Sequence, residues 1–332
     1  MSKPIIAFVT GGYSSERVIS YKSAINIEKF IDRDRYEVYR IDITPEAWFH
    51  PTASGDQIPV DKHDFSLLIN DHRITFDAVF IGIHGTPGED GKLQGYLDMM
   101  GLPYTSCDVT SSAITFNKRY TVAVAGASGY HVARSAHLFK HSYRKQDVDR
   151  LGLRLPVFVK PNNGGSSIGM GKVHQPEALE AAIETAFRED DQILVEEAIQ
   201  GREFTIGVYR SNGVAVTLPF TEVMSENDFF DFEAKYQGKS SEVTPAVCSD
   251  EMAEKIRSAA KGIYDVFNCR GVVRMDFIYN VQEQAPFLLE INTIPGQTAA
   301  SIIPQQVAAA GMQIGAFYTL LIEEALSFKK KA

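Results

Sequence analysis

Apolar strand patterns alternate with helix patterns through the first third of the chain, and this alternation is the strongest constraint on its fold. Residues 4–9 and 78–83 form continuous apolar runs, which are typical of parallel strands covered on both faces. A further strand is predicted at 38–43. A helix is predicted from Ser15 onward, with one apolar stripe made of Val18, Tyr21, Ala24, Ile25 and Ile31.

Strands that alternate with helices predict a doubly wound α/β unit. Such a unit binds ligands beyond the carboxyl ends of its strands, where Gly11-Gly12 and His84-Gly85 follow two of the predicted strands. A short helix at 93–100 completes this segment. The fold class alone assigns no function, because one fold serves many activities.

Composition excludes several classes of protein. A length of 332 residues favours two or three domains, and a net charge of −9 argues against an electrostatic nucleic-acid binder. Three widely spaced cysteines without metal-ligand spacing are typical of a reducing compartment. The apolar run at 5–9 is too short for a signal peptide, and no run is long enough to span a membrane. We therefore expect a cytoplasmic protein that binds neither nucleic acid nor membrane.

The rest of the chain has a less regular order of elements. Asn212-Gly213 favours a tight hairpin turn, and residues 225–246 form a polar, aromatic loop without a clear period. A loop of this length is usually functional or disordered. The other predicted elements are helices at 112–127, 176–188, 250–267 and 313–330, strands at 157–160 and 193–196, and a strand pair before the last helix.

Residues 164–171 form the densest glycine stretch. Their backbone N–H groups and two serine hydroxyls suit nucleotide phosphates, and Lys160 just before them favours an anion; an ordinary hairpin turn is the alternative. Two better-known motifs are excluded. Residues 165–169 match the G-x-S-x-G motif of hydrolases, but the helix that should follow comes too late. Residues 88–92 lack the first glycine and the Ser or Thr of a phosphate-binding P-loop.

Two strands near the C-terminus carry the most informative set of polar side chains. A turn centred near Glu283 pairs Asp276 with Glu290 and Arg274 with Asn292. Because side chains alternate along a strand, all four then lie on one face of the sheet. Two carboxylates and an amide oxygen are hard ligands that suit magnesium rather than zinc.

A solvated polar face with an ion pair is the alternative interpretation of these strands. Their apolar residues indicate strands inside a core, however, where unpaired carboxylates are costly. Residues 292–298 then form a tight turn, and Ser301 lies near the start of a helix. Backbone N–H groups in this turn are suited to hold an oxyanion or a carboxylate.

Taken together, these motifs resemble an ATP-grasp enzyme, and specifically the D-alanine–D-alanine ligases. The resemblance covers almost the whole chain in the right order, which is more specific than any single motif. It is carried by Gly11-Gly12, Ser15-Glu16-Arg17, His84-Gly85, Gly88-Glu89-Asp90-Gly91, Gln94-Gly95, Asn117-Lys118, Lys160-Pro161, Gly165-Ser166-Ser167, Glu196-Glu197, Gly201-Arg202-Glu203, Lys235-Tyr236, Arg274, Asp276 and the run 290–296.

The resemblance implies a doubly wound N-terminal α/β domain (1–116) with the first substrate site, followed by an ATP-grasp fold of α+β type. A central subdomain (117–202) would carry the glycine-rich loop, and a C-terminal subdomain (203–332) would carry the metal site and a lid at 225–246. ATP would lie between these two subdomains. Its predicted contacts are Lys118, Lys160, Ser166, Ser167, Glu196, Glu197, Ile199 and Glu203.

The resemblance also implies the roles of the substrate and metal residues. Glu16 would bind the ammonium of the first D-alanine, supported by Ser166 and Tyr236, and His84 is assigned to substrate binding. Arg274 and the Gly296 N–H would stabilise the oxyanion. The carboxylate of the second D-alanine would be bound by Lys235, Ser301 and Ile302, and two Mg²⁺ ions, with Mn²⁺ as a substitute, would be held by Asp276, Glu290 and Asn292. A homodimer is expected.

The sequence departs from the pattern of these ligases at a few positions. Asn117 stands where many members have Asp, Glu197 where Lys is common, and Gln297 where an apolar residue is common; the role of Gln297 stays open. Ligases that join D-alanine to D-serine or D-lactate are alternatives, although Tyr236 argues against them. A nucleotide-binding relative without turnover is a further alternative, against which the presence of Arg274, Glu290 and Asn292 argues.

Overall fold

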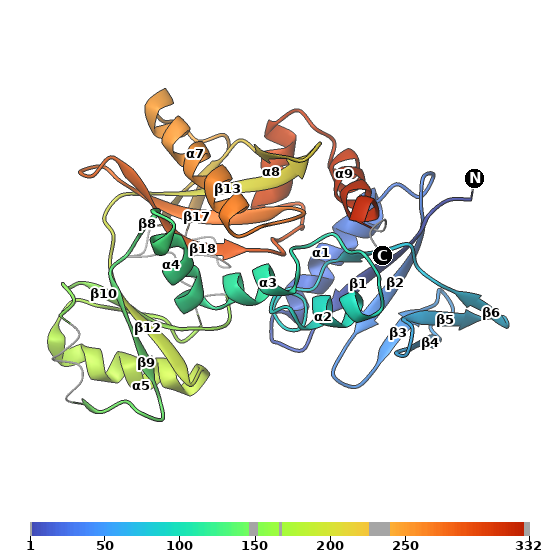
Figure 1. The fold of residues 1–332 in the computed structure, drawn as a ribbon, viewed down its shortest axis with the longest axis horizontal. Helices are drawn as coiled ribbons and strands as arrows, with labels where there is room; N and C mark the ends of the chain where they lie inside the picture. Colours follow the sequence, from blue (N-terminus) through green and yellow to red (C-terminus); the bar gives the residue numbers. More distant parts are fainter. Residues whose placement is uncertain (1, 146–151, 166–167, 226–239, 329–332) are drawn as a thin grey trace.

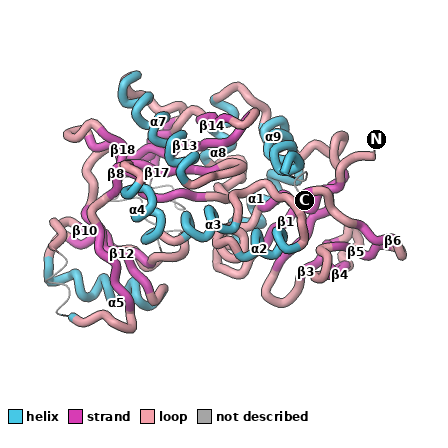
Figure 2. The backbone as a smooth tube through the Cα atoms, viewed as in Figure 1, coloured by secondary structure: helices cyan, strands magenta, loops and turns pink. Residues whose placement is uncertain are grey.

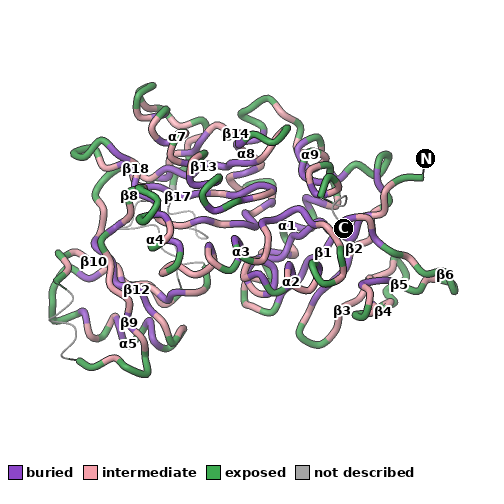
Figure 3. Tube along the Cα trace, viewed as in Figure 1, coloured by how far each residue is buried: buried purple, intermediate pink, exposed green. Residues whose placement is uncertain are grey.

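The computed structural model describes residues 2–145, 152–165, 168–225 and 240–328. Within these ranges the strands form three sheets, which Figures 1 and 2 show as separate groups. No helix in the described part of the chain is long and apolar enough to cross a membrane. Buried residues concentrate along β1 (Ile5–Gly11), β13 (Arg202–Ser211) and β17 (Val273–Asn280) (Figure 3).

The first sheet combines a parallel centre with an antiparallel extension. Its strand order is β6-β5-β4-β3-β2-β1-β7, and β1 pairs in parallel with β2 and β7. The three predicted strands are thereby confirmed, while the extension was not predicted because its strands are short and half-exposed. The bounds are β2 (Glu37–Ile43), β3 (Trp48–Pro51), β4 (Gln57–Asp61), β5 (Ser66–Ile69), β6 (His72–Ile74) and β7 (Ala78–Ile81).

Helices cover both faces of the parallel strands. On one face α2 (Lys92–Met99) packs through Leu93 and Leu97. On the other face lie α1 (Arg17–Phe30) and α9 (Ile314–Ser327), the last helix of the chain (Figure 1). The ring of Tyr318 on α9 meets that of Phe80 on β7 edge to face, with centroids 5.6 Å apart. A helix from the C-terminus therefore completes the core of the N-terminal sheet.

The predicted apolar stripe of α1 is wrong in part. Val18 and Ile25 are 59% and 70% exposed, although Ala24 and Ile31 are buried as predicted. The buried face instead includes the polar residues Ser20, Ser23 and Asn26. A prediction from hydrophobicity alone places the buried face of α1 wrongly, because the polar side chains on that face bond to neighbouring segments of the protein rather than to water.

The second sheet belongs to the central part of the chain. Its order is β11-β10-β12-β9, and α5 (Leu179–Glu189) covers it after a short 3-10 helix, η2 (Pro176–Ala178). The predicted helix at 112–127 is two helices, α3 (Val109–Phe116) and α4 (Lys118–Ala127), because Asn117 is extended and its side chain accepts from the Tyr120 N–H. The strands are β9 (Ser135–Phe139), β10 (Val157–Pro161), β11 (Gly171–Val173) and β12 (Gln192–Glu197).

The third sheet has the order β16-β15-β13-β17-β18-β8, with β14 paired to β13. The predicted hairpin joins β13 to β14, and both Asn212 and Gly213 have the positive φ that a type I′ turn requires. Helix α7 (Asp250–Val266) packs on this sheet, and α8 (Ile302–Ala309) bonds to β13 through Gln306. The remaining strands are β8 (His131–Val132), β14 (Val214–Thr217), β15 (Thr221–Ser225), β16 (Ser240–Val243) and β18 (Ala285–Asn292).

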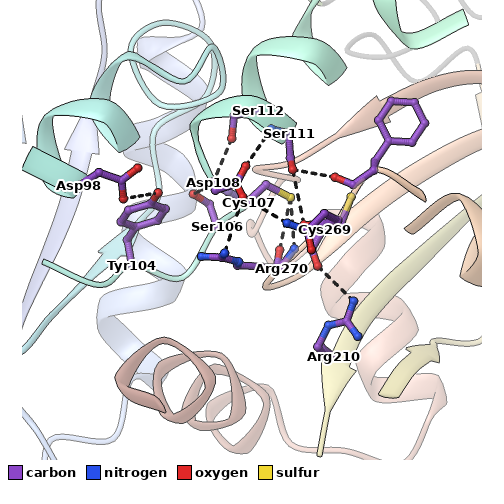
Figure 4. Close-up of polar contacts among 12 residues, drawn as sticks. Asp98, Tyr104, Ser106, Cys107, Asp108, Ser111, Ser112, Arg210, Cys269 and Arg270 are labelled. Carbon is purple, nitrogen blue, oxygen red and sulfur yellow. Dashed lines mark hydrogen bonds and ion pairs between the residues drawn. The ribbon is translucent and has the colours of Figure 1, made fainter. Parts of the chain in front are cut away.

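The segment that leaves the first sheet is bonded to the third (Figure 4). The Arg270 N–H donates to Cys107 Sγ at 3.4 Å, and the Ser111 hydroxyl donates to the Phe267 carbonyl at 2.6 Å. Arg270 also pairs with Asp108, which caps α3. The three cysteines are free, with Cys107 and Cys269 buried. These contacts fix the N-terminal sheet beside the C-terminal one.

Candidate active site

Strands β17 and β18 place four polar side chains on one face, as predicted. Their register pairs Arg274 with Asn292 and Asp276 with Glu290. A β-bulge then shifts the register between Asp276 and Phe277. The Arg274 guanidinium forms two bonds to Asp276, of 3.0 and 2.8 Å, and its Nη2 lies 3.7 Å from Glu290 Oε1. These carboxylates raise the pKa of Arg274, so the residue stays charged.

The oxygen atoms of this face fit a divalent cation. Asp276 also accepts from the Thr205 hydroxyl and from Asn292 Nδ2, the latter at 3.3 Å. Groups of three or more His, Cys, Asp or Glu suited to a metal do not occur among the described residues. The donor set is therefore two carboxylates and an amide, which suits a hard ion that also takes ligand oxygens.

Two lysines predicted to contact phosphates lie near the glycine-rich stretch. Lys118, at the start of α4, donates to the Gly164 carbonyl at 2.7 Å. Lys160, on β10, forms an ion pair with Glu196 on the adjacent strand β12. Both members of that ion pair are largely buried. An anion can bind here once these lysines exchange their protein partners for it.

The end of β12 carries Glu197, one of the predicted ATP contacts. The Glu197 side chain points to Arg154, with bonds of 2.9 Å to the Arg154 N–H and Nη2. The Glu197 N–H donates to the Arg134 carbonyl and the Ala198 N–H to the Pro156 carbonyl, both at 2.9 Å. Ile199 follows on the loop, and Glu203 lies on β13 opposite Ile278. The Glu197 side chain and the N–H groups of residues 197 and 198 are thus engaged within the protein.

The carboxylate of Glu16 lies where the first and second sheets approach each other. A Cβ added to Gly85 would come 2.8 Å from Glu16 Oε2, and one added to Gly165 would come 2.6 Å from Oε1. Only glycine fits at either position while Glu16 keeps this place. An open cleft of about 600 Å³ is lined by Glu16, Gly85 and Gly164, among others. The predicted first-substrate residue therefore faces the glycine-rich stretch.

Glu89, for which no role was predicted, links the segment after β7 to the turn after β18. Its two oxygens accept from the Gly85 N–H at 2.7 Å and the Ile294 N–H at 3.2 Å. Burial and the nearby Glu16 charge raise the pKa of Glu89 to about 8, while Arg274 opposes this shift. The motif Gly88-Glu89-Asp90-Gly91 was the sequence signal that could have drawn attention to Glu89. Its bond to Ile294, 205 residues away, could not be predicted because it depends on the tertiary fold.

The His84 side chain is held by contacts with other residues of the protein and does not project into open space. Its Nε2 lies 3.1 Å from Ser23 Oγ, its backbone N–H donates to Ser20 Oγ, and its ring also bonds the Ile294 backbone. Burial and the Arg274 charge lower the pKa of His84 to about 4, so the ring is neutral at pH 7. Because both ring nitrogens are engaged, a direct bond to substrate would require one of these contacts to break.

The turn after β18 brings Gly296 beside the start of α8. Ser301 precedes α8, and its hydroxyl accepts from the Thr298 N–H at 3.0 Å. A Cβ at Gly296 would approach Ser301 Oγ to 2.8 Å, so a larger residue there would displace the hydroxyl. The N–H of Ile302 belongs to the first turn of α8, where helix N–H groups attract anions.

Four predicted residues lie outside the described part of the chain: Ser166, Ser167, Lys235 and Tyr236. Most of the predicted lid also falls outside it, at 226–239, and the described residues on its far side form β16. The arrangement that remains brings together Glu16, Arg274, Asp276, Glu290 and Gly296 with two lysines. This set suits the activation of a carboxylate by phosphate.

Comparison with known proteins assigns this arrangement to a family. The model described as D-ala D-ala ligase N-terminus matches residues 5–107, and the one described as D-ala D-ala ligase C-terminus matches residues 126–323. The chain belongs to the D-alanine–D-alanine ligase family. Its ATP-grasp fold and its class of ATP-dependent ligases agree with the resemblance stated from the motifs.

Full-length relatives and solved structures extend this match. The D-alanine–D-alanine ligase of Parabacteroides distasonis is 47% identical, over 99% of each chain, and that of Flavobacterium johnsoniae is 44% identical, over 97% of this chain and 99% of the relative. The D-alanine–D-alanine ligase of Coxiella burnetii superimposes with a TM-score of 0.88 at 28% identity, over 99% of this chain and 96% of the Coxiella chain. The VanG D-Ala:D-Ser ligase of Enterococcus faecalis superimposes with a TM-score of 0.86 at 30% sequence identity. This match covers 98% of the present chain and 100% of the VanG chain.

Proposed function

We propose that the protein joins two D-alanine molecules to D-alanyl-D-alanine, consuming ATP, to supply peptidoglycan precursor synthesis. The observation that carries this proposal is the register of β17 and β18, which puts Arg274, Asp276, Glu290 and Asn292 on one face of the sheet. Family membership supports the ligase activity, and the named relatives at 44–47% identity support D-alanine as both substrates.

The first step activates the carboxylate of the first D-alanine, because a carboxylate is itself a poor electrophile. Glu16 holds the ammonium group of this D-alanine, with Ser166 and Tyr236 in support. A carboxylate oxygen attacks the γ-phosphorus of ATP, and the bond to ADP breaks to leave an acyl phosphate. Lys118 and Lys160 bind the phosphates and neutralise charge on the transferring group. The remaining nucleotide contacts are Ser167, Glu196, Glu197, Ile199 and Glu203.

The second step forms the peptide bond. The neutral amine of the second D-alanine attacks the acyl carbon, and the resulting oxyanion is stabilised by Arg274 and the Gly296 N–H. Collapse of the tetrahedral intermediate breaks the bond to phosphate, and the departing phosphate takes up the proton that the amine loses. Ser301, the Ile302 N–H and Lys235 hold the carboxylate of the second D-alanine. The lid, over 225–246, excludes water that would otherwise hydrolyse the acyl phosphate.

Asp276, Glu290 and Asn292 would hold two Mg²⁺ ions, or Mn²⁺ in their place, and these ions would neutralise phosphate charge. We divide the chain into an N-terminal domain (1–116), a central subdomain (117–202) and a C-terminal subdomain (203–332). Because ATP is a substrate, the cytoplasm is the expected location. A homodimer is the expected assembly, which light scattering would test.

The deciding experiment measures ADP release by the full chain with Mg²⁺ and ATP, at increasing D-alanine, with mass spectrometry of the product. D-Alanyl-D-alanine as the main product is the expected result. Parallel reactions with added D-serine or D-lactate test the alternative second substrates, of which D-serine is favoured by the structural match to a D-Ala:D-Ser ligase. Absence of product with every acceptor would leave a nucleotide-binding protein without turnover.

A further inference from the structure

Helix α1 buries three polar side chains while exposing three large apolar ones, Val18, Ile25 and Phe30. A buried polar group is costly unless it is hydrogen-bonded. The Ser23 hydroxyl accepts from the Gln297 N–H at 3.2 Å, and Asn26 Nδ2 donates to the Gln297 carbonyl at 2.8 Å. Helix α1 therefore binds both backbone groups of one residue in the turn after β18.

Ile294, three residues earlier, is bound in the same way. Its N–H donates to Glu89, and its carbonyl accepts from the ring of His84. Side chains of the N-terminal domain thus take the N–H groups of Ile294 and Gln297, and Pro295 has none. Within the segment 294–297, the N–H of Gly296 is therefore the one backbone N–H that these side chains do not bind.

The Gln297 side chain reaches back to the peptide that carries this N–H. Gln297 is only 6% exposed, and its Nε2 donates to the Pro295 carbonyl at 3.2 Å. The Pro295 carbonyl and the Gly296 N–H belong to the same planar peptide unit and point in opposite directions. Fixing the carbonyl therefore fixes the direction of the N–H. Donation to the carbonyl also polarises the amide, which strengthens its N–H as a donor.

The orientation of the Gln297 amide is determined by its partners. The Pro295 carbonyl can only accept, so the side-chain nitrogen must face it. The other end, Oε1, accepts from the Tyr318 hydroxyl of α9 at 3.3 Å. Asn26 in turn bonds the Tyr318 oxygen. An apolar residue at position 297 would fill the space but would leave the Pro295 carbonyl without this donor.

We infer that Gln297 is a positioning residue that orients the Pro295–Gly296 peptide, so that the Gly296 N–H is aimed at the oxyanion formed during ligation. This inference rests on the proposed function, because it concerns the oxyanion of that reaction. A purely structural role would require only that Gln297 fill its site and pair with Tyr318.

Three variants of the full chain separate these roles. Gln297→Met keeps the length of the side chain and removes the amide. Gln297→Glu keeps an acceptor for Tyr318 but cannot donate to Pro295. Tyr318→Phe removes the other partner of Gln297 and leaves the bond to Pro295 in place. Thermal unfolding and ATP binding establish that each variant is folded before its kinetics are compared.

We expect Gln297→Met to lower kcat for dipeptide formation about 10-fold, since misdirecting an oxyanion donor costs part of its effect. Gln297→Glu should lower kcat by at least as much. Tyr318→Phe should keep kcat within about twofold of the wild type. KM for ATP should be unchanged in all three variants. A phosphinate analogue of the dipeptide, with tetrahedral phosphorus in place of the peptide carbonyl, should bind Gln297→Met about 10-fold more weakly. Binding of the product dipeptide should not change.

The result that overturns the inference is a Gln297→Met enzyme that melts earlier but keeps kcat and phosphinate affinity. Equal losses in Tyr318→Phe and Gln297→Met would also overturn it, because they would assign the effect to packing around Tyr318. A wild-type protein that forms no dipeptide contradicts the proposed function instead, and the inference falls with it. The two failures are thus distinguished by the wild-type reaction alone.

Discussion

The two halves of the site are assembled in different ways. Around Gly296, neutral groups hold the backbone: the hydroxyl of Ser23, the amides of Asn26 and Gln297, and the neutral ring of His84. On the nucleotide side, the charged residues hold one another, as in the pairs Lys160–Glu196 and Arg274–Asp276. The hydrogen bonds of the first half are complete without ligands. In the second half, the charged residues would exchange their partners in the protein for ligand groups.

This difference has a physical basis. A preorganised donor stabilises developing charge without reorganisation during the reaction, so the oxyanion side gains from rigid neutral contacts. Buried phosphate-binding cations, in contrast, need counter-charges when no phosphate is bound, because an unpaired buried charge is costly. Glu196 and Asp276 supply these counter-charges. The predictions below test whether the halves respond differently to substitution.

The largest effect is expected at Arg274, which contributes to both halves. Arg274→Ala should lower kcat about 10²- to 10³-fold, the range found when an oxyanion donor is removed. Arg274→Lys retains the charge but not the forked geometry, and should fall between Ala and wild type. Steady-state ADP release measures both. Wild-type turnover in Arg274→Ala would remove this residue from the mechanism.

A smaller effect, confined to the nucleotide side, is expected at Lys160. Lys160→Met should raise KM for ATP about 10- to 100-fold, the value of one or two charge-assisted hydrogen bonds. The variant leaves Glu196 buried and unpaired, so the double variant Lys160→Met/Glu196→Gln should regain stability without regaining ATP affinity. Lys140, which bonds the Phe187 carbonyl and Asp191, provides the control: Lys140→Met should bind ATP normally.

The pH dependence of stability should distinguish Glu89, which joins the two halves. Its pKa is about 8 in the folded protein, against an ordinary pKa of about 4.3. Between these pH values the folded state holds a proton that the unfolded state lacks, so stability falls as pH rises. From pH 5.5 to 8.5, urea unfolding should show the wild type losing at least about 1 kcal/mol relative to Glu89→Gln. A constant difference would mean that Glu89 is already ionised in the folded protein at pH 5.5, with a pKa below this interval.

The smallest effects contrast the two faces of α1. Asn26→Ala removes a buried donor to the Gln297 carbonyl and should lower the free energy of unfolding by about 1 kcal/mol or more. Ile25→Ala, one position earlier on the exposed face, should change it by less than about 0.5 kcal/mol. Chemical denaturation compares the pair directly. A larger loss at Ile25 would mean that this face is covered in solution.

The sequence predicted the charged half better than the neutral half. The face formed by Arg274, Asp276, Glu290 and Asn292 follows from strand alternation around one short turn, so local pattern sufficed. The break at Asn117, between α3 and α4, was missed because both flanking segments favour helix.

The contacts around Gly296 could not be predicted in this way. Ser23 and Gln297 are separated by 274 residues, and serine and asparagine on a helix are ordinarily surface residues. Only the tertiary fold shows that they face a backbone turn. The available signal was an anomaly: polar residues at a helical spacing (20, 23, 26) opposite an apolar pair that the fold leaves exposed.

The position of α9 has a consequence for how the protein is made. This helix covers one face of the N-terminal sheet, yet its residues are the last described helix to leave the ribosome. During synthesis the strands of that sheet are present long before the helix that completes their core. The newly made N-terminal segment must therefore wait, with Phe8 and Phe80 incompletely covered, until residues 314–327 have been synthesised.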